Sequence, residues 1–367
     1  MPDNTQLLEF IAQKRFHQRI VLPATTEHGP LAVTYADIGP QTKKDGSPTP
    51  TMLLIQGMAG SRLWCCQKDH LANKLGVRML SIDRPGIGGS TPVPPEKRVK
   101  VWLETVSAVL EHLSIKHVVP ISHSAGTIYL LNLLSRRRDL LWPKMPLAVL
   151  MAPWVEPKYS DILSLQMAKM LPTGVLKQWN KVMKFVVTKA APSLSSSVDI
   201  LSSMGGSIPR GSKDIDHREP NLAADEIGPR TAEQLEKLCI EYIFLEDTTG
   251  MNDEAVVCLK KTAGLWEACE DLPIYIRWLV QAEEWYKQGH PEEQKPLQLK
   301  AIFAEKDGMI GPQGQKYFEN CFAPINLNNV VSFQSVMEKG TGHDTLWASE
   351  TGAFLKVLED IKDAMSQ

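Results

Sequence analysis

The sequence predicts an α/β fold in which a mostly parallel, eight-stranded sheet carries helices on both faces and is interrupted by a helical insertion. Three observations lead to this prediction. Unbroken apolar runs alternate with helical patterns, which is typical of strands buried on both faces of a sheet. The alternation stops near Val155 and resumes at Leu297. The chain also has 367 residues, which is more than one compact domain usually needs.

The first part of the chain supplies six of the predicted strands. Residues 18–25 and 31–39 are predicted to be strands joined by a short turn at His28-Gly29-Pro30. Apolar runs then predict buried strands at residues 51–57, 77–83, 117–122 and 147–152. Helices are predicted between them at residues 63–75, at residues 100–113, where apolar positions recur every three or four residues, and from Thr127 to Leu134.

The remainder of the chain divides into an insertion and a second part of the core. Residues 155–296 show helical patterns, such as that at residues 274–287, and no strong buried strand. Strands are predicted again at residues 297–307 and 330–336, and a closing helix at 347–362. We therefore expect a core formed by residues 18–154 and 297–367, with residues 155–296 as a helical cap.

The predicted cap contains aromatic and methionine residues that suit an apolar pocket, although most of them are expected to form the core of the cap itself. These residues are Trp179, Trp266, Trp278, Trp285, Met167, Met170, Met183 and Met204. A serine- and glycine-rich stretch at residues 193–212 is expected to be a loop that gates access to this pocket. No cationic cluster indicates a phosphate or carboxylate anchor, so the expected substrate is medium-sized and largely apolar.

Composition and charge exclude several classes of partner and site. The net charge is −2, which gives no field that favours nucleic acid or an anionic membrane. No apolar run is long enough to span a membrane, and the N-terminus does not resemble a secretory signal. The six cysteines lack metal-binding spacing, so no metal and no cofactor are expected. We expect a reduced, cytoplasmic protein, and the sequence does not indicate its oligomeric state.

The stretch SHSAG, residues 122–126, has the pattern of a nucleophilic serine on a sharp turn. An apolar strand precedes Ser124 and a helical pattern follows it. Small residues two positions before and after the serine are needed because the backbone is crowded at such a turn. Ser122 occupies the position where glycine is usual, and it is small enough to fit. Ser124 is therefore the predicted nucleophile, provided that a base, an orienting acid and oxyanion donors accompany it.

Four motifs in the expected order resemble those of the α/β-hydrolase superfamily, and the resemblance covers about residues 18–362. They are QGMAG at residues 56–60, DRPGIGGS at 83–90, SHSAG at 122–126 and GTGHD at 340–344. Gln56 stands where the family has histidine, so the hydrogen bonds that support this loop are left open, whereas its backbone donors are not affected. The stretches DRPGIGGS and GHDTLW, together with the long helical cap, are most similar to uncharacterised α/β-hydrolases of filamentous fungi, some of which serve small-molecule biosynthesis.

The resemblance implies a role for each candidate residue. His343 would be the base, and Asp307, which follows a predicted strand, would orient it. Glu305 and Glu156 are alternative acids. The backbone N–H groups of Met58 and Ala125 would form the oxyanion hole. His123 and Trp154 are expected to contribute to substrate binding or to packing.

A serine hydrolase that cleaves an ester or thioester is the function that these residues favour. Acyl transfer, cyclisation or lyase chemistry on the same residues is the alternative, because the acyl-enzyme can be shared. Epoxide hydrolysis and dehalogenation are disfavoured, since relatives with those activities carry aspartate where Ser124 stands. A non-enzymatic binding protein with the same fold is also disfavoured, because binding alone would not require Ser124, Asp307 and His343 together. A nucleotide-binding loop at residues 86–89 is disfavoured, because the prolines that follow prevent a helix from starting there.

Overall fold

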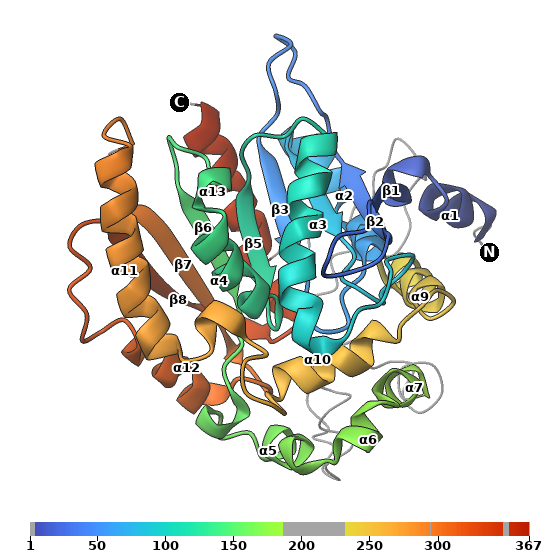
Figure 1. Cartoon of the computed structure of the whole chain (residues 1–367). Coiled ribbons are helices and arrows are strands. Elements are labelled where there is room, and N and C mark those ends of the chain that lie inside the picture. The colour runs from blue at the N-terminus through green and yellow to red at the C-terminus, as the bar shows by residue number, and fades with distance from the viewer. Residues whose placement is uncertain (1–3, 186–231, 294, 348–351, 367) are drawn as a thin grey trace.

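The computed structural model describes residues 4–185, 232–293, 295–347 and 352–366 (Figure 1). Its centre is one eight-stranded sheet with the order β1-β2-β4-β3-β5-β6-β7-β8. Antiparallel pairing joins β1 to β2 and β2 to β4, and every other pair is parallel. The strands are β1 (Gln18–Leu22), β2 (Leu31–Ile38), β3 (Thr51–Ile55), β4 (Arg78–Ile82), β5 (Val119–His123), β6 (Leu147–Met151), β7 (Leu297–Lys306) and β8 (Val331–Gly342).

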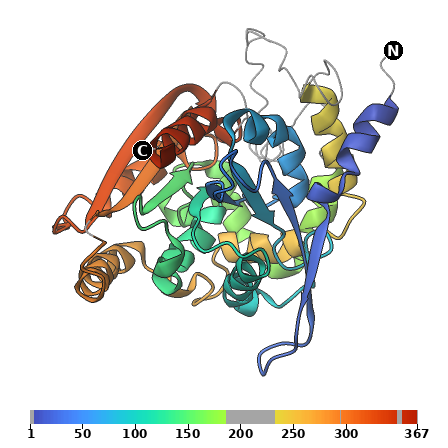
Figure 2. The same cartoon turned by 90° about the horizontal axis from the view of Figure 1, so that it is seen from above.

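Helices cover both faces of the sheet, as the apolar character of β3 to β6 requires. All residues of these four strands are buried. Figures 1 and 2 show helices on both faces of the sheet. On the first face lie α2 (Asp69–Leu75) and α13 (Ala353–Ser366), and on the second lie α3 (Arg98–His112), α4 (Gly126–Arg136) and α11 (Leu272–Gly289). The remaining core helix, α12 (Gly311–Asn320), follows β7.

The described part of the chain between β6 and β7 contains helices and no strand, which agrees with an inserted helical cap. These helices are α5 (Leu163–Met170), α6 (Thr173–Leu176), α7 (Trp179–Phe185), α9 (Ala232–Ile243), α10 (Gly250–Cys258) and the core helix α11. Figure 1 shows α5, α6, α7 and α10 together beyond one end of the sheet. The predicted gating stretch at residues 193–212, with Met204, lies outside the described residues.

Two local features differ from the sequence-based expectation. The predicted helix at residues 63–75 is divided into a 3₁₀ segment, η2 (Arg62–Gln67), and α2, with Lys68 at the junction. Ser61 caps η2, and Asp83 accepts a hydrogen bond from the Arg62 N–H at 2.6 Å, which fixes this tighter turn. An additional helix, α1 (Asn4–Ile11), precedes the predicted core. It buries Leu7, Phe10 and Ile11, so the core extends further toward the N-terminus than expected.

None of the described helices is both long and apolar enough to cross a membrane. All six cysteines are buried and carry free thiols.

Candidate active site

Ser124 lies on a strained turn between β5 and α4. Its φ is +51°, a left-handed conformation that non-glycine residues adopt rarely. The turn is closed on both sides, because the Ser124 N–H donates to the Met151 carbonyl at 2.9 Å and the Thr127 N–H donates to the Ser124 carbonyl at 2.9 Å. A Cβ at Gly126 would lie 2.3 Å from the Ile55 carbonyl oxygen. Glycine there lets α4 start directly against β3, which leaves the serine hydroxyl at the end of the sheet.

Ser124, His343 and Asp307 form a continuous chain of hydrogen bonds. The His343 Nε2 lies 2.8 Å from the Ser124 Oγ. On the other side of the ring, Nδ1 lies 2.9 and 3.0 Å from the two Asp307 oxygens. The residues follow β5, β7 and β8. In sequence, β6 and the insertion lie between β5 and β7, and α12 lies between β7 and β8. This geometry suits proton transfer from the hydroxyl to a ring that a carboxylate orients.

The charges at this site support one another. Burial alone would raise the pKa of Asp307, but the charge and hydrogen bond of His343, with the Met309 and Ile310 N–H groups, bring it below its usual value. Burial alone would lower the pKa of His343, but the Asp307 charge and hydrogen bond raise it. The arrangement therefore keeps Asp307 ionised and makes the His343 ring a stronger base than an isolated buried histidine.

Two backbone N–H groups face the same cavity as Ser124. Met58 and Ala125 both line it, and neither N–H donates a hydrogen bond to any other described residue. Ala125 immediately precedes α4, where the first N–H groups of a helix lack internal acceptors. The Met58 loop is held by Arg84, whose guanidinium donates to the carbonyls of Gln56, at 2.7 Å, and of Gly57. Arg84 thus supports the loop in which Gln56 replaces the family histidine.

The cavity above Ser124 has a volume of about 290 Å³ and a largely apolar wall. Its large apolar side chains come from the core and from α7, α9 and α10 of the insertion. They are Met58, Trp64, Trp154, Met183, Ile240, Ile243, Phe244, Met251, Met309 and Trp347. Two carboxylates, Glu236 and Asp344, also line it, and no lysine or arginine does so among the described residues. Such a wall fits a small to medium apolar group.

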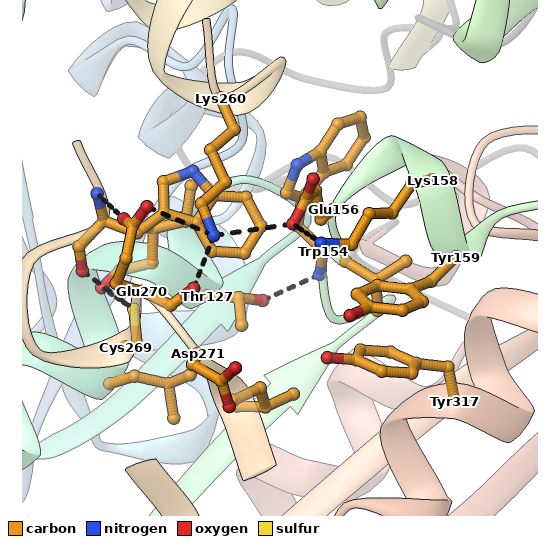
Figure 3. A pocket seen from close by; sticks show the side chains of 15 residues that line it. Thr127, Trp154, Glu156, Lys158, Tyr159, Lys260, Cys269, Glu270, Asp271 and Tyr317 are labelled. Carbon is orange, nitrogen blue, oxygen red and sulfur yellow. Dashed lines mark hydrogen bonds and ion pairs between the residues drawn. The ribbon is translucent and has the colours of Figure 1, made fainter. Parts of the chain in front are cut away.

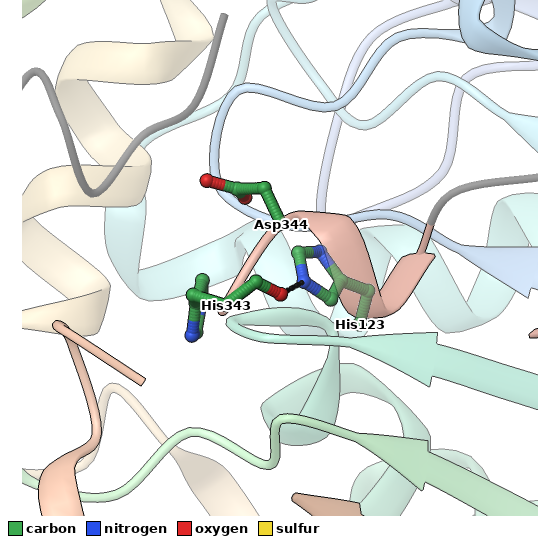
Figure 4. Close-up of side chains that lie close together, drawn as sticks. All are labelled: His123, His343 and Asp344. Carbon is green, nitrogen blue, oxygen red and sulfur yellow. Dashed lines mark hydrogen bonds between the residues drawn. The ribbon is translucent and has the colours of Figure 1, made fainter. Parts of the chain in front are cut away.

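Trp154 and His123, the two predicted substrate-binding residues, both line this cavity. Trp154 is also fixed by the framework, because its indole N–H donates to the Cys258 carbonyl at 3.0 Å. His123 is buried and its Nε2 donates to the His343 carbonyl at 2.9 Å (Figure 4). Burial and the nearby His343 lower the pKa of His123 to about 4, so its ring is neutral at physiological pH. His123 thus contacts the main chain of His343, whereas the His343 ring contacts the Ser124 hydroxyl.

Three side chains that could bind a metal ion lie close together beside the His343 ring. Side-chain donor atoms of His123, His343 and Asp344 lie within 4.8 Å of one another. Both nitrogens of His343 already contact Ser124 and Asp307, and the His123 Nε2 contacts a carbonyl. A metal ion would therefore have to displace these hydrogen bonds.

The two alternative acids lie elsewhere. Glu156 lines a separate cavity of about 70 Å³ together with Lys158 and Lys260 (Figure 3). Its carboxylate contacts Lys158 at 2.9 Å, Lys169 at 3.0 Å and Lys260 at 3.4 Å. Glu305 is exposed and accepts a hydrogen bond from the Gly340 N–H at 2.9 Å. Of the three candidate acids, Asp307 is the one whose carboxylate contacts the His343 ring.

The glycine-rich stretch at residues 83–90 joins the core to the insertion. The Gly88 N–H donates to the Asp247 carbonyl at 2.8 Å, and the Gly250 N–H at the start of α10 donates to the Gly86 carbonyl at 2.7 Å. A Cβ at Gly86, whose φ is +73°, would lie 2.8 Å from the Gly250 nitrogen. The glycines therefore allow α10, which carries pocket residues, to approach the core closely.

Several contributors to the site were not predicted from the sequence. Arg84 supports the Met58 loop, and Lys68 donates a hydrogen bond to the carbonyl of Trp347, which lies in the loop after His343. Arg84 lies inside the DRPGIGGS motif, so the sequence could have indicated that this residue contributes to the site. Lys68 lies in a predicted helix where a lysine is ordinarily exposed, so local sequence gave no sign of its burial.

Comparisons with known proteins agree with this architecture. Residues 50–181 match the family model described as the alpha/beta hydrolase fold. Among solved structures, the chain is similar to a carboxylesterase of the thaumarchaeon Nitrososphaera gargenis, with a TM-score of 0.55 and 10% identity over 95% of this chain and 99% of that one. No curated protein matches the sequence.

Two further structures show the range of chemistry on this fold. A thermophilic esterase from Thermogutta terrifontis has a TM-score of 0.50 and 15% identity, and the match covers 95% of this chain and 98% of that one. An epoxide hydrolase from Vigna radiata has a TM-score of 0.50 and 14% identity, over 96% and 99% of the two chains. At these identities the likeness concerns the fold. With the family-model match and the eight-stranded sheet, it shows that this chain has the alpha/beta hydrolase fold.

Proposed function

We propose that the protein is a serine hydrolase that cleaves an ester or thioester of a medium-sized, largely apolar substrate through an acyl-enzyme on Ser124. The observation that carries this proposal is the 2.8 Å contact between the Ser124 Oγ and the His343 Nε2, on a turn with a φ of +51°. A strained turn persists only where the surrounding structure enforces it, and such turns concentrate at functional sites.

The proposed reaction proceeds in two halves. In the first, the Ser124 Oγ attacks the substrate carbonyl while the His343 Nε2 takes its proton, and the Met58 and Ala125 N–H groups stabilise the oxyanion. The protonated His343 then gives the proton to the leaving alcohol or thiol, and the acyl group remains on Ser124. In the second half, water attacks the acyl-enzyme with His343 as the base. Asp307 fixes the tautomer of His343 and stabilises the imidazolium in both halves.

The apolar wall of the cavity supports a neutral acyl chain or alcohol portion as the bound group. The esterases among the similar structures support the same class of reaction, and the serine at residue 124 argues against the epoxide-hydrolase chemistry of another neighbour.

A fluorophosphonate probe tests the proposal directly. We expect the full-length protein to be labelled on Ser124, as mapped by mass spectrometry, and the Ser124→Ala variant to remain unlabelled. Ser332→Ala, which changes an exposed serine on β8, is the matched control and should label like the wild type. Turnover of p-nitrophenyl esters, with analysis of the products, would then separate hydrolysis from transfer. Folded wild-type protein that takes up no label would contradict the proposal.

A further inference from the structure

The loop that follows β8 carries His343 at one end and Trp347 at the other. Within it, the Trp347 N–H donates to the Asp344 carbonyl at 3.0 Å and the Gly342 N–H donates to the Thr345 hydroxyl at 2.7 Å. These bonds make the loop compact. They do not by themselves fix its position against β5, where Ser124 lies.

Contacts from outside the loop reach the backbone carbonyl at each of its two ends. His123 Nε2 donates to the His343 carbonyl at 2.9 Å, and Figure 4 shows this oxygen directed at the His123 ring. Lys68 Nζ donates to the Trp347 carbonyl at 2.7 Å. The two contacts are joined, because the Trp347 and His123 rings stack with centroids 5.5 Å apart and planes inclined by 25°.

Lys68 is an unusual residue for this position. Its side chain is 2% exposed, and its ammonium lies 4.9 Å from the Trp347 ring centroid and 4.0 Å from that of Phe354. No carboxylate among the described residues forms an ion pair with it. Burial lowers the pKa of Lys68 to about 7, which reflects the cost of keeping this cation out of water. A methionine would fill the same space without that cost, so the lysine is not explained by packing.

We propose that Lys68, Trp347 and His123 act as positioning residues, forming a brace that fixes the main chain of His343 and thereby sets its imidazole against Ser124. This inference rests on the proposed function of Ser124 and His343. A small displacement of a base from its nucleophile slows proton transfer strongly, because both atoms must remain within hydrogen-bond reach. The brace fixes the backbone of His343, and Asp307 fixes its ring.

The first test removes the ammonium and keeps the stem, with Lys68→Met. We expect kcat and the rate of fluorophosphonate labelling to fall about tenfold, while KM stays within about twofold, because Lys68 does not line the cavity. The melting temperature should be unchanged or higher, since a buried cation is removed. Lys74→Met, which changes an exposed lysine of α2, is the matched control. A purely structural lysine would instead give a lower melting temperature with an unchanged rate.

The second test separates the donor of His123 from its ring. His123→Phe keeps a ring to stack on Trp347 but cannot donate to the His343 carbonyl, whereas His123→Gln keeps an N–H at a similar reach. We expect the labelling rate to fall about tenfold in the Phe variant and to be largely restored in the Gln variant. The downfield proton resonance between His343 and Asp307 should broaden in the Phe variant and persist in the Gln variant.

The outcomes distinguish this inference from the function on which it rests. Wild-type protein that is not labelled on Ser124 would contradict the proposed function. Wild-type protein that is labelled, together with Lys68→Met and His123→Phe variants that label at the wild-type rate, would contradict the brace alone.

Discussion

At the scale of single residues, the electrostatic balance at His343 leads to a prediction about pH. Burial lowers the pKa of His343, and the carboxylates of Asp307 and, to a smaller extent, Asp344 raise it to a net value above its usual 6.5. The proposed mechanism needs the neutral ring as a base. Activity should therefore fall as the pH drops through this raised pKa, and kcat/KM should show its acidic inflection above pH 6.5.

Asp307→Asn tests the origin of that inflection. Without the carboxylate, burial dominates, so the acidic inflection of the residual activity should move to lower pH, while kcat falls about 10³–10⁴-fold. Asp344→Asn should shift the inflection in the same direction by less. The measurement is the pH dependence of kcat/KM for a neutral ester. An inflection that stays in place in Asp307→Asn would mean that another group controls it.

The close approach at Gly126 leads to a prediction about stability. A Cβ there would lie 2.3 Å from the Ile55 carbonyl oxygen and 2.9 Å from that of Gln56, and these are backbone atoms that cannot rotate away. Gly126→Ala should therefore lower the free energy of unfolding by about 1–3 kcal/mol, as overpacked sites do. Gly174→Ala is the control, because a Cβ there has no atom within 4 Å. Denaturant unfolding of both variants measures the difference, and equal stabilities would contradict this account.

Local sequence pattern identified some of these residues better than others. Ser124 was accessible to prediction because a buried strand, small residues and a helical pattern all lie within a few positions of it. The brace was not, because Lys68 and Trp347 are 279 positions apart and their contact depends on how two loops pack. The burial of Lys68 is a tertiary property, and the sequence around it contains no sign of this burial.

At the scale of elements, α10 is anchored to the core by a buried cluster of charges. Glu254 is fully buried, and its Oε1 accepts hydrogen bonds from Arg98 at 2.7 Å and from the Tyr129 hydroxyl at 2.5 Å. Arg84, which also holds the Met58 loop, lies 3.2 Å from the same oxygen. Burial would raise the pKa of Glu254, but the two arginines bring it below its usual value, so the carboxylate is charged.

Glu254→Gln should therefore destabilise the protein. The substitution removes the carboxylate that Arg84 and Arg98 share and leaves Arg98 with the more distant Asp253, at 3.7 Å. Removal of one partner from a buried pair costs about 3–5 kcal/mol. Activity should fall with it, because Met251 and Cys258 of the same helix line the cavity. Urea unfolding and ester turnover are the measurements, with Glu241→Gln on the exposed side of α9 as the control. Unchanged stability in Glu254→Gln would show that the cluster does not anchor α10.

Secondary structure was predicted correctly where a single hydrophobic pattern dominated the sequence. The four central strands are fully buried, and unbroken apolar runs identified them. The predicted helix at residues 63–75 was wrong in its first half, because a contact with distant Asp83 fixes a 3₁₀ turn there. The boundaries of the cap at residues 155 and 296 remain predictions.

At the scale of the whole molecule, the parallel sheet explains why residues far apart in sequence meet. β3 and β5 pair in register with Ile55 opposite Ser122, so the Met58 loop and the Ser124 turn leave the sheet side by side. β6, β7 and β8 continue the parallel order, which brings Asp307 and His343 to the same edge. The cap helices then supply the cavity wall over this edge. The site is thus a consequence of topology, and helices of the insertion form part of the wall of its cavity.

The distribution of charge around the cavity leads to a prediction about substrate preference. Glu236 and Asp344 line the cavity, and the described wall contains no lysine or arginine. A carboxylate on the acyl chain would lose hydration inside a largely apolar wall, near the carboxylates of Glu236 and Asp344. We expect a neutral ester to be cleaved with a kcat/KM at least about tenfold higher than a hemisuccinate ester of the same length and leaving group, which corresponds to about 1.4 kcal/mol. The double variant Glu236→Gln/Asp344→Asn should reduce this ratio, mainly by lowering the KM of the anionic ester. Equal kcat/KM values for the two esters in the wild type would contradict the prediction and would indicate that the acyl chain lies away from these carboxylates.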